Sequence, residues 1–185
     1  MHAHSSGTKS FSQKLADETG IAINRCYQCG KCSAGCPMSS EMDMPPSVVL
    51  RHLQTNNEML VQKAIQSYSI WLCLSCETCL CRCPMEIETA KVMDYLRAEA
   101  IRTKQVNPKA RKIVAFHKAF LSSVKKNGRL YEIGLIFKYK LASGEFLKDM
   151  VLAPGMFLKG KLHLFPERIK RTAQLQNIAA KSVKH

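Results

Sequence analysis

Long apolar runs are missing from this sequence. Its 185 residues are 46% apolar and 23% charged, but the apolar runs are short, as in residues 150–158, where Pro154 interrupts the run. A membrane-spanning helix needs about 18 or more consecutive apolar residues, and a secretory signal needs an apolar stretch that the first residues do not have. We therefore expect a cytoplasmic chain without a membrane span. Because disulfides persist mainly in oxidising compartments, its cysteines are interpreted as thiolates.

Common signatures of nucleotide-binding and catalytic sites are also absent. The sequence has no G-x-G-x-x-G and no G-x-x-x-x-G-K motif, so the usual phosphate-binding loops are excluded. The isolated histidines His52, His117 and His163 are interpreted as surface or packed side chains. No segment alternates apolar and polar residues as a half-buried strand would. The chain is thus predicted to be all-α, with no group of its own that would act on a substrate.

What the sequence has in excess is cysteine, with nine residues that all lie between positions 26 and 83. Eight of them form two copies of one motif, C-x2-C-x2-C-x3-C-P. The first copy is Cys26, Cys29, Cys32 and Cys36, and the second is Cys73, Cys76, Cys79 and Cys83. Each cysteine recurs at an offset of 47 residues, as does the proline that follows the motif. The pattern indicates an internal duplication.

This spacing is typical of cysteines that bind a [4Fe-4S] cluster. Three cysteines separated by two residues on a tight loop reach three irons of one cluster, and in two-cluster ferredoxins the fourth cysteine of each run binds the other cluster. The sequence therefore predicts two [4Fe-4S] clusters with exchanged fourth ligands. The predicted ligands are Cys26, Cys29, Cys32 and Cys83 for the first cluster, and Cys36, Cys73, Cys76 and Cys79 for the second.

Two other interpretations of the cysteines are weaker. Zinc ligands usually come as two C-x2-C pairs separated by a loop, and four cysteines within eleven positions fit a tetrahedron poorly. A disulfide framework lacks its secretory context. The ninth cysteine, Cys81, lies between two predicted ligands and is interpreted as a small packed residue without a role.

The remaining sequence predicts helices around the two motifs. Apolar residues at helical spacing, with proline, asparagine and glycine at the ends, predict helices after Asp43, over 57–66, over 89–103, from Asn107-Pro108 to Gly128, over 130–141 and after Pro166. We divide the chain into an N-terminal segment (1–20), a two-cluster ferredoxin domain (21–128) and a basic C-terminal extension that binds a partner (129–185).

Charge is distributed unevenly along the chain. Residues 1–100 carry 9 basic and 10 acidic side chains, whereas residues 101–185 carry 19 and 4, within a total net charge of +14. A basic half of this size indicates an acidic partner. The apolar strip at 153–166, with lysines among its apolar residues, predicts that 153–185 lies along a partner chain, although a tail that wraps its own domain remains open. Nucleic-acid binding is disfavoured, because only 7% of the residues are aromatic.

The number of cluster ligands indicates the function. With all eight ligand positions filled, neither cluster keeps an iron free for catalysis, and electron relay is what remains. Arg25 and Lys31 flank the first motif and Arg82 precedes Cys83, whereas Glu77 lies in the second motif. Because positive charge stabilises the reduced cluster, the first cluster is expected to have the higher potential.

The segments RCYQCGKCSAGCP, MDMPPSVVLRHLQ, SIWLCLSCETCLCRCP and DYLRAEAIR resemble the iron-sulfur C subunit of heterodisulfide reductase from methanogenic archaea, over about residues 20–105. The resemblance implies an alpha-helical ferredoxin fold in a cytoplasmic complex. There, the iron-sulfur subunit passes electrons from a flavin-containing, electron-bifurcating subunit to the catalytic subunit, which reduces the mixed disulfide of coenzyme M and coenzyme B in methanogenesis. A hydrogenase or formate dehydrogenase module would join through the flavin-containing subunit.

The same cluster motif occurs in relay modules of succinate dehydrogenases, fumarate reductases and glycolate oxidases. The relay role is therefore predicted more firmly than the pathway. This chain has no Cys-Cys pair of the kind that marks the catalytic subunit. It resembles the relay subunit alone.

Overall fold

The computed structural model describes residues 9–144 together with residues 174, 177 and 178, and its regular elements in this part of the chain are all helical. The prediction of an all-α chain is thereby confirmed. The chain divides into two compact units at Ala110 and Arg111, whereas the sequence suggests a boundary after Gly128. Each unit is described separately below, and the predicted apolar strip at 153–166 lies outside the described residues.

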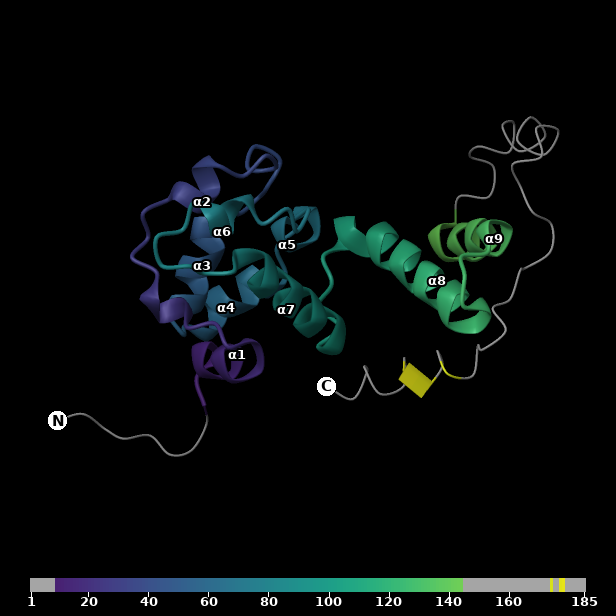
Figure 1. Cartoon of the computed structure of the whole chain (residues 1–185), viewed down its shortest axis with the longest axis horizontal. Coiled ribbons are helices and arrows are strands. Elements are labelled where there is room, and N and C mark those ends of the chain that lie inside the picture. Colours follow the sequence, from purple (N-terminus) through teal and green to yellow (C-terminus); the bar gives the residue numbers. More distant parts are fainter. Residues whose placement is uncertain (1–8, 145–173, 175–176, 179–185) are drawn as a thin grey trace. The chain divides into compact units, whose positions relative to one another are not determined.

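The described residues of the first unit, 9–110, form seven α-helices and two short 3-10 helices (Figure 1). They are α1 (Phe11–Thr19), η1 (Ile23–Arg25), α2 (Lys31–Ala34), α3 (Pro46–Gln54), α4 (Glu58–Ile65), α5 (Ser69–Leu72), α6 (Thr78–Cys81), α7 (Thr89–Arg102) and η2 (Pro108–Ala110). Their apolar faces meet in one core, in which Val49, Leu53, Ile70, Val92 and Leu96 are fully buried. This core carries the two cysteine motifs.

Local sequence explains where the longer helices begin. Helix α3 begins at Pro46, since a proline at the first helical position has no N–H that needs a partner. Helix α4 begins after Asn57, whose side-chain oxygen accepts hydrogen bonds from the N–H groups of Met59 (3.0 Å) and Leu60 (3.4 Å). Helix α7 ends at Arg102, one residue before the predicted end. These three predicted helices are confirmed.

Helix α1 is not among the helices that the sequence predicts, since residues 1–20 are assigned there only to an N-terminal segment. Ser10 and Gln13 form a capping box at its start, and Gly20 ends it with φ +76°. Leu15 is fully buried, and α1 contacts α3 and α7. The sequence does contain signals for this helix, namely a serine three residues before a glutamine and a glycine at the far end. They are easy to overlook, because the helix is short and has only one fully buried leucine.

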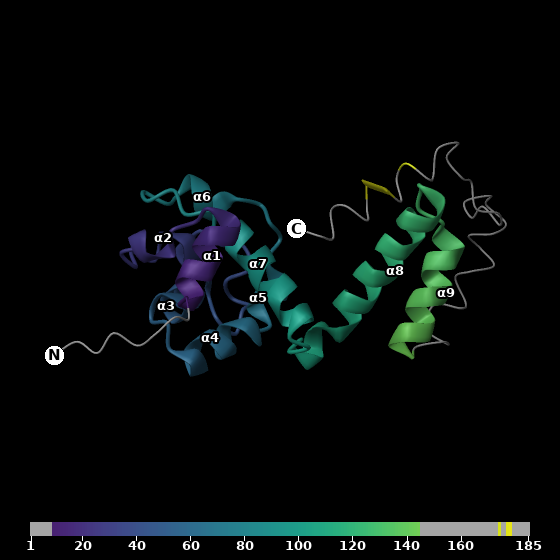
Figure 2. The ribbon, with the colours of Figure 1, turned by 90° about the horizontal axis from the view of Figure 1, so that it is seen from below.

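The second unit contains a pair of packed helices (Figure 2). They are α8 (Arg111–Asn127) and α9 (Glu132–Ser143). Gly128 and Gly144 end them with φ +75° and +74°, a conformation that side chains with a Cβ rarely adopt. The stop at Gly128 is predicted from the sequence. No helix among the described residues is long and apolar enough to cross a bilayer.

Candidate iron-sulfur centres

The two cysteine motifs adopt the same backbone conformation. Gln28 and Ser75, which are 47 residues apart, both have positive φ angles of 62° and 52°. Gly30 and Glu77, again 47 apart, have φ angles of 75° and 58°. A glutamate in this region is unusual, because its Cβ crowds the backbone. The duplication is therefore present in the conformation of the loops as well as in their sequence.

The repeats meet through equivalent elements. Helices α2 and α6 follow the second cysteine of each motif, are offset by 47 residues, and contact each other (Figure 1). Just beyond them, Gly35 lies against its own counterpart, Arg82, and a Cβ at position 35 would clash with the Arg82 side chain. Only a residue without a side chain leaves room for the arginine in its present position. The close approach brings the fourth cysteine of each motif toward the other motif.

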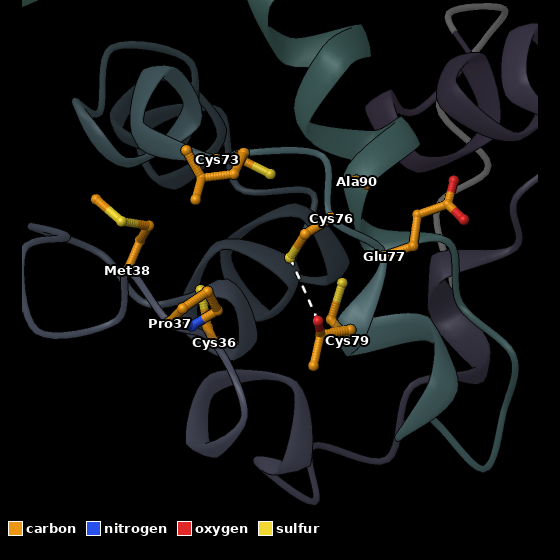
Figure 3. A pocket seen from close by; sticks show the side chains of 10 residues that line it. Cys36, Pro37, Met38, Cys73, Cys76, Glu77, Cys79 and Ala90 are labelled. Carbon is orange, nitrogen blue, oxygen red and sulfur yellow. Dashed lines mark hydrogen bonds between the residues drawn. The ribbon is translucent and has the colours of Figure 1, made fainter.

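One hollow on the surface of the first unit is lined by four of the predicted ligands. Cys36 of the first motif lies there with Cys73, Cys76 and Cys79 of the second (Figure 3). Met38 and Ala90 add apolar walls. The Glu77 carboxylate points away from the cysteines in this view (Figure 3). This is the ligand grouping that the exchange pattern predicts for the second cluster.

Three of the remaining predicted ligands, Cys26, Cys29 and Cys83, lie near Tyr27. The pKa of this phenol is raised, first by desolvation and then by the negative thiolates of Cys29, Cys83 and Cys26. Cys83 therefore lies beside the first motif, although its sequence neighbours belong to the second. The pKa of the Cys32 thiol is also raised, chiefly by burial and further by the nearby Cys26.

Several sulfurs of the predicted ligands take part in weak hydrogen bonds. The Gln28 Nε2 donates to the Cys26 Sγ, and the Ile87 N–H donates to the Cys83 Sγ, both at 3.4 Å. The Cys76 Sγ and the Thr78 Oγ1 are also 3.4 Å apart. Hydrogen bonds to ligand sulfurs stabilise the more negative, reduced form of an iron-sulfur group. Cys81 is exposed and does not line the hollow.

Helix α5 is a single turn that leads directly into Cys73, and an isolated turn is not stable alone. Asp43 holds its start: the carboxylate accepts hydrogen bonds from the N–H groups of Tyr68 (3.0 Å) and Ser69 (2.9 Å), and from the Ser69 hydroxyl (2.5 Å). Partial burial raises the pKa of Asp43, but these hydrogen bonds outweigh it, and the net pKa is lowered. Asp43 thus ties the segment after Cys36 to the helix before Cys73.

Arg97 of α7 holds the other end of α5. Its guanidinium donates hydrogen bonds to the carbonyl oxygens of Ile70 and Cys73. A cation at this position complements the negative end of a helix. Its Nη1 also pairs with Asp94 at 2.8 Å.

Gln54 of α3 makes the corresponding contacts in the first repeat. Its Nε2 donates to the carbonyl oxygens of Ile23 (3.0 Å) and Cys26 (2.6 Å). Ile23 and Cys26 are each 47 residues before the two acceptors of Arg97. Asp43, Gln54 and Arg97 are not among the residues predicted from the sequence, because all three lie 24 or more residues from the backbone groups they bind. No spacing rule connects such residues.

The donor set fits a cubane better than a single ion. Within the part of the chain that the structure describes, no three His, Cys, Asp or Glu side chains converge closely enough to bind one metal ion. A four-cysteine zinc site needs all its sulfurs about 2.3 Å from one centre. In a cubane each thiolate binds a different iron, so the sulfurs stand farther apart. Four cysteines around one hollow fit the second arrangement.

Comparison with known proteins first defines the class. Residues 22–87 match the family model of the 4Fe-4S dicluster domain, which covers both motifs and the helices between them. The chain therefore contains an iron-sulfur domain with two [4Fe-4S] clusters, and the cofactors predicted from the cysteine spacing are confirmed.

Relatives then define the kind of protein. The chain is 30% identical, over 120 residues, to the C subunit of the H(2):CoB-CoM heterodisulfide,ferredoxin reductase of Methanothermobacter thermautotrophicus, a match that covers 65% of this chain and 60% of the relative. It is 33% identical over 82 residues to the iron-sulfur C subunit of the CoB--CoM heterodisulfide reductase of Methanopyrus kandleri (44% and 40%). Identity to the second such C subunit of Methanocaldococcus jannaschii is 27% over 119 residues (64% and 62%).

The chain spans about three-fifths of the length of the first of these relatives. Over this part it is similar in sequence to the C subunits of heterodisulfide reductases, and its iron-sulfur domain lies within the matched region. The resemblance noted in the sequence is confirmed.

Proposed function

We propose that the chain is the electron-relay subunit of a cytoplasmic heterodisulfide reductase complex. Cys26, Cys29, Cys32 and Cys83 would hold one [4Fe-4S] cluster, and Cys36, Cys73, Cys76 and Cys79 the other. When bound, these clusters take up and release single electrons. The observation that supports the proposal best is the hollow that Cys36 lines together with three cysteines of the other motif.

The exchanged ligands suit a relay because they couple the two redox centres through the protein. The two loops are in contact through α2 and α6, so both centres would lie within one small unit. Each loop also has one exposed cysteine, Cys29 in the first and Cys76 in the second. Large apolar side chains stand beside them: Tyr27 is 59% exposed and Leu74 is 63% exposed, again 47 residues apart. A protein partner can therefore approach each centre separately.

The names of the relatives point to the partners. We propose that the flavin-containing subunit of the complex supplies the electrons, and that the catalytic subunit uses them to reduce the heterodisulfide of coenzyme M and coenzyme B. The basic second half supports binding to an acidic partner surface. Residues 153–185 would lie along the catalytic subunit.

The ligand exchange is tested by combining cysteine variants in the anaerobically purified chain. Wild type should contain about eight irons, and Cys36→Ser should lose about four of them. Adding Cys73→Ser should cost nothing further, because both residues serve the same cluster. Adding Cys26→Ser instead should remove nearly all the iron. The opposite pattern, in which Cys36 and Cys26 behave as one set, would refute the exchange.

The relay is tested with the flavin-containing and catalytic subunits present. A chain that holds both clusters should support electron flow from the reduced flavin to the heterodisulfide, and the Cys36→Ser chain should not. Undiminished flow through the Cys36→Ser chain would show that electrons do not pass through both centres.

A further inference from the structure

The two repeats use the same hydrogen bonds to hold their first cysteine, but with different chemistry. In the first repeat the donor is the neutral amide of Gln54, and in the second it is the guanidinium of Arg97. Both side chains reach the carbonyl of the motif's first cysteine and the carbonyl three residues before it. The acceptor carbonyls are therefore equivalent in the two repeats, whereas the donor side chains differ in charge by one positive unit.

Water screens the charge of Arg97 only weakly, because its side chain is largely buried. The Arg97 side chain is only 20% exposed, and its partner Asp94 is 56% exposed, so water screens the carboxylate more than the guanidinium. Exposed cations flank the first motif, namely Arg25 and Lys31, but solvent screens both of them. The Arg97 guanidinium touches the backbone of a predicted ligand directly.

Of the other charges near the second group, Arg82 acts in the same direction, whereas the exposed carboxylates of Glu77 and Asp43 oppose it and are screened by water. Arg82 extends over Gly35, the residue before Cys36, so its charge lies toward the second group as well as beside Cys83. Glu77, the acidic residue of the second motif, is exposed, and its carboxylate points away from the cysteines (Figure 3). The expectation of a higher potential for the first cluster counts Arg25, Lys31 and Arg82 at that cluster and Glu77 at the second, and it does not include Arg97.

We propose that Arg97 is the residue that sets the two clusters apart in potential. As a positioning residue it holds the Cys73 carbonyl as Gln54 holds that of Cys26, and its additional charge makes the cluster of Cys36, Cys73, Cys76 and Cys79 the easier one to reduce. This rests on the proposed function. Within the relay, a single electron then resides mainly on that cluster, whose exposed cysteine is Cys76.

The matched variants are Arg97→Gln and Gln54→Arg, which exchange the residue types of the two donors that bind equivalent carbonyls. Arg97→Gln keeps a donor and removes the charge. Gln54→Arg keeps a donor and adds the charge, while it removes the oxygen that accepts a hydrogen bond from the Gln28 amide. Arg102→Gln, on the same helix as Arg97 but paired with Glu99 at the surface, is the control for a general change in net charge.

The measurement is a redox titration of the anaerobic holo chain followed by electron paramagnetic resonance, with iron content determined for each variant. Arg97→Gln should lower the higher of the two potentials by about tenfold in the reduction equilibrium, or about 59 mV for one electron. Gln54→Arg should raise the lower potential by a similar factor. Arg97→Lys, which keeps the charge, should restore most of the shift, and Arg102→Gln should change neither potential.

Three results would overturn the proposal. Arg97→Gln could shift the lower potential, which would make the cluster beside Arg97 the harder one to reduce. Arg97→Lys could behave like Arg97→Gln, which would assign the effect to geometry alone. Gln54→Arg could leave both potentials unchanged, and this variant decides the matter if Arg97→Gln fails to retain its iron. A wild-type chain without eight irons would instead refute the proposed function.

Discussion

Asp43 should control how firmly the second cysteine motif is held. Its carboxylate accepts three hydrogen bonds at the start of α5, from the N–H groups of Tyr68 and Ser69 and from the Ser69 hydroxyl. A hydrogen bond to a charged group contributes about 1.5 to 3 kcal/mol, and a helix cap about 0.5 to 2 kcal/mol. Because Asp43 is partly exposed, we expect Asp43→Ala to cost about 1 to 2 kcal/mol of the free energy of unfolding.

In Asp43→Ala, stability should be lost around the second cysteine motif in particular, as well as in the domain as a whole. Helix α5 leads into Cys73, so the cluster of that motif should release its iron faster than the other in the variant. The assay is denaturant unfolding of the anaerobic holo chain, followed by circular dichroism and by the visible absorbance of the clusters. Asp43→Asn, which keeps one acceptor oxygen, should lose about half as much. Glu41→Gln, a change at a nearby exposed carboxylate, is the matched control.

The effect of pH has a defined sign. The folded pKa of Asp43 is lowered, so its contribution is fully present above the unfolded value of about 3.9 and is lost as pH falls through the folded pKa. The difference in stability between wild type and Asp43→Asn should therefore shrink in that acidic range. A difference that stays constant, or equal rates of iron release from both clusters in Asp43→Ala, would refute the account of α5.

Three further predictions concern the ninth cysteine, helix α1 and the C-terminal residues. Cys81→Ser should keep about eight irons and full electron transfer, and the loss of one cluster would show that Cys81 is a ligand. Leu15→Ala should cost about 2 to 5 kcal/mol, measured by denaturant unfolding, because it empties a fully buried site beneath α1; an unchanged midpoint would mean that α1 is dispensable. Deleting residues 153–185 should abolish co-purification with the catalytic subunit while both clusters remain, and a truncated chain that still binds this partner would contradict the docking role.

The parts of the site that sequence could predict are those with a fixed spacing. Eight cysteines at a constant offset indicate two clusters, and Pro46, Asn57 and Gly128 mark helix ends through properties that act within a few residues. Asp43 and Arg97 act across more than 20 residues of chain, and a lone aspartate or arginine has many interpretations. Their roles depend on tertiary packing and became visible only in the fold.

Arg82 shows what a sequence-based interpretation of charge leaves out. In the sequence it stands beside Cys83, so its charge is assigned there to the first cluster. An arginine side chain extends several ångströms from its backbone, and here it crosses to Gly35 in the other repeat. Neighbours in sequence determine where a long side chain begins, and packing determines where its charge lies.

The contact between Gly35 and Arg82 also constrains how the two halves of the domain can diverge. Residues 35 and 82, which are equivalent in the duplication, face each other there. The Arg82 side chain therefore occupies the space that a side chain at position 35 would need. Two arginines would compete for one space and repel each other, and two glycines would leave the space open to water. The effects of substitutions at 35 and 82 on stability should therefore be non-additive. Gly35→Ala should be tolerated when the exposed arginine side chain moves aside. Larger residues at position 35 should be tolerated only when position 82 becomes small. The duplication has turned one ancestral position into two that must change together.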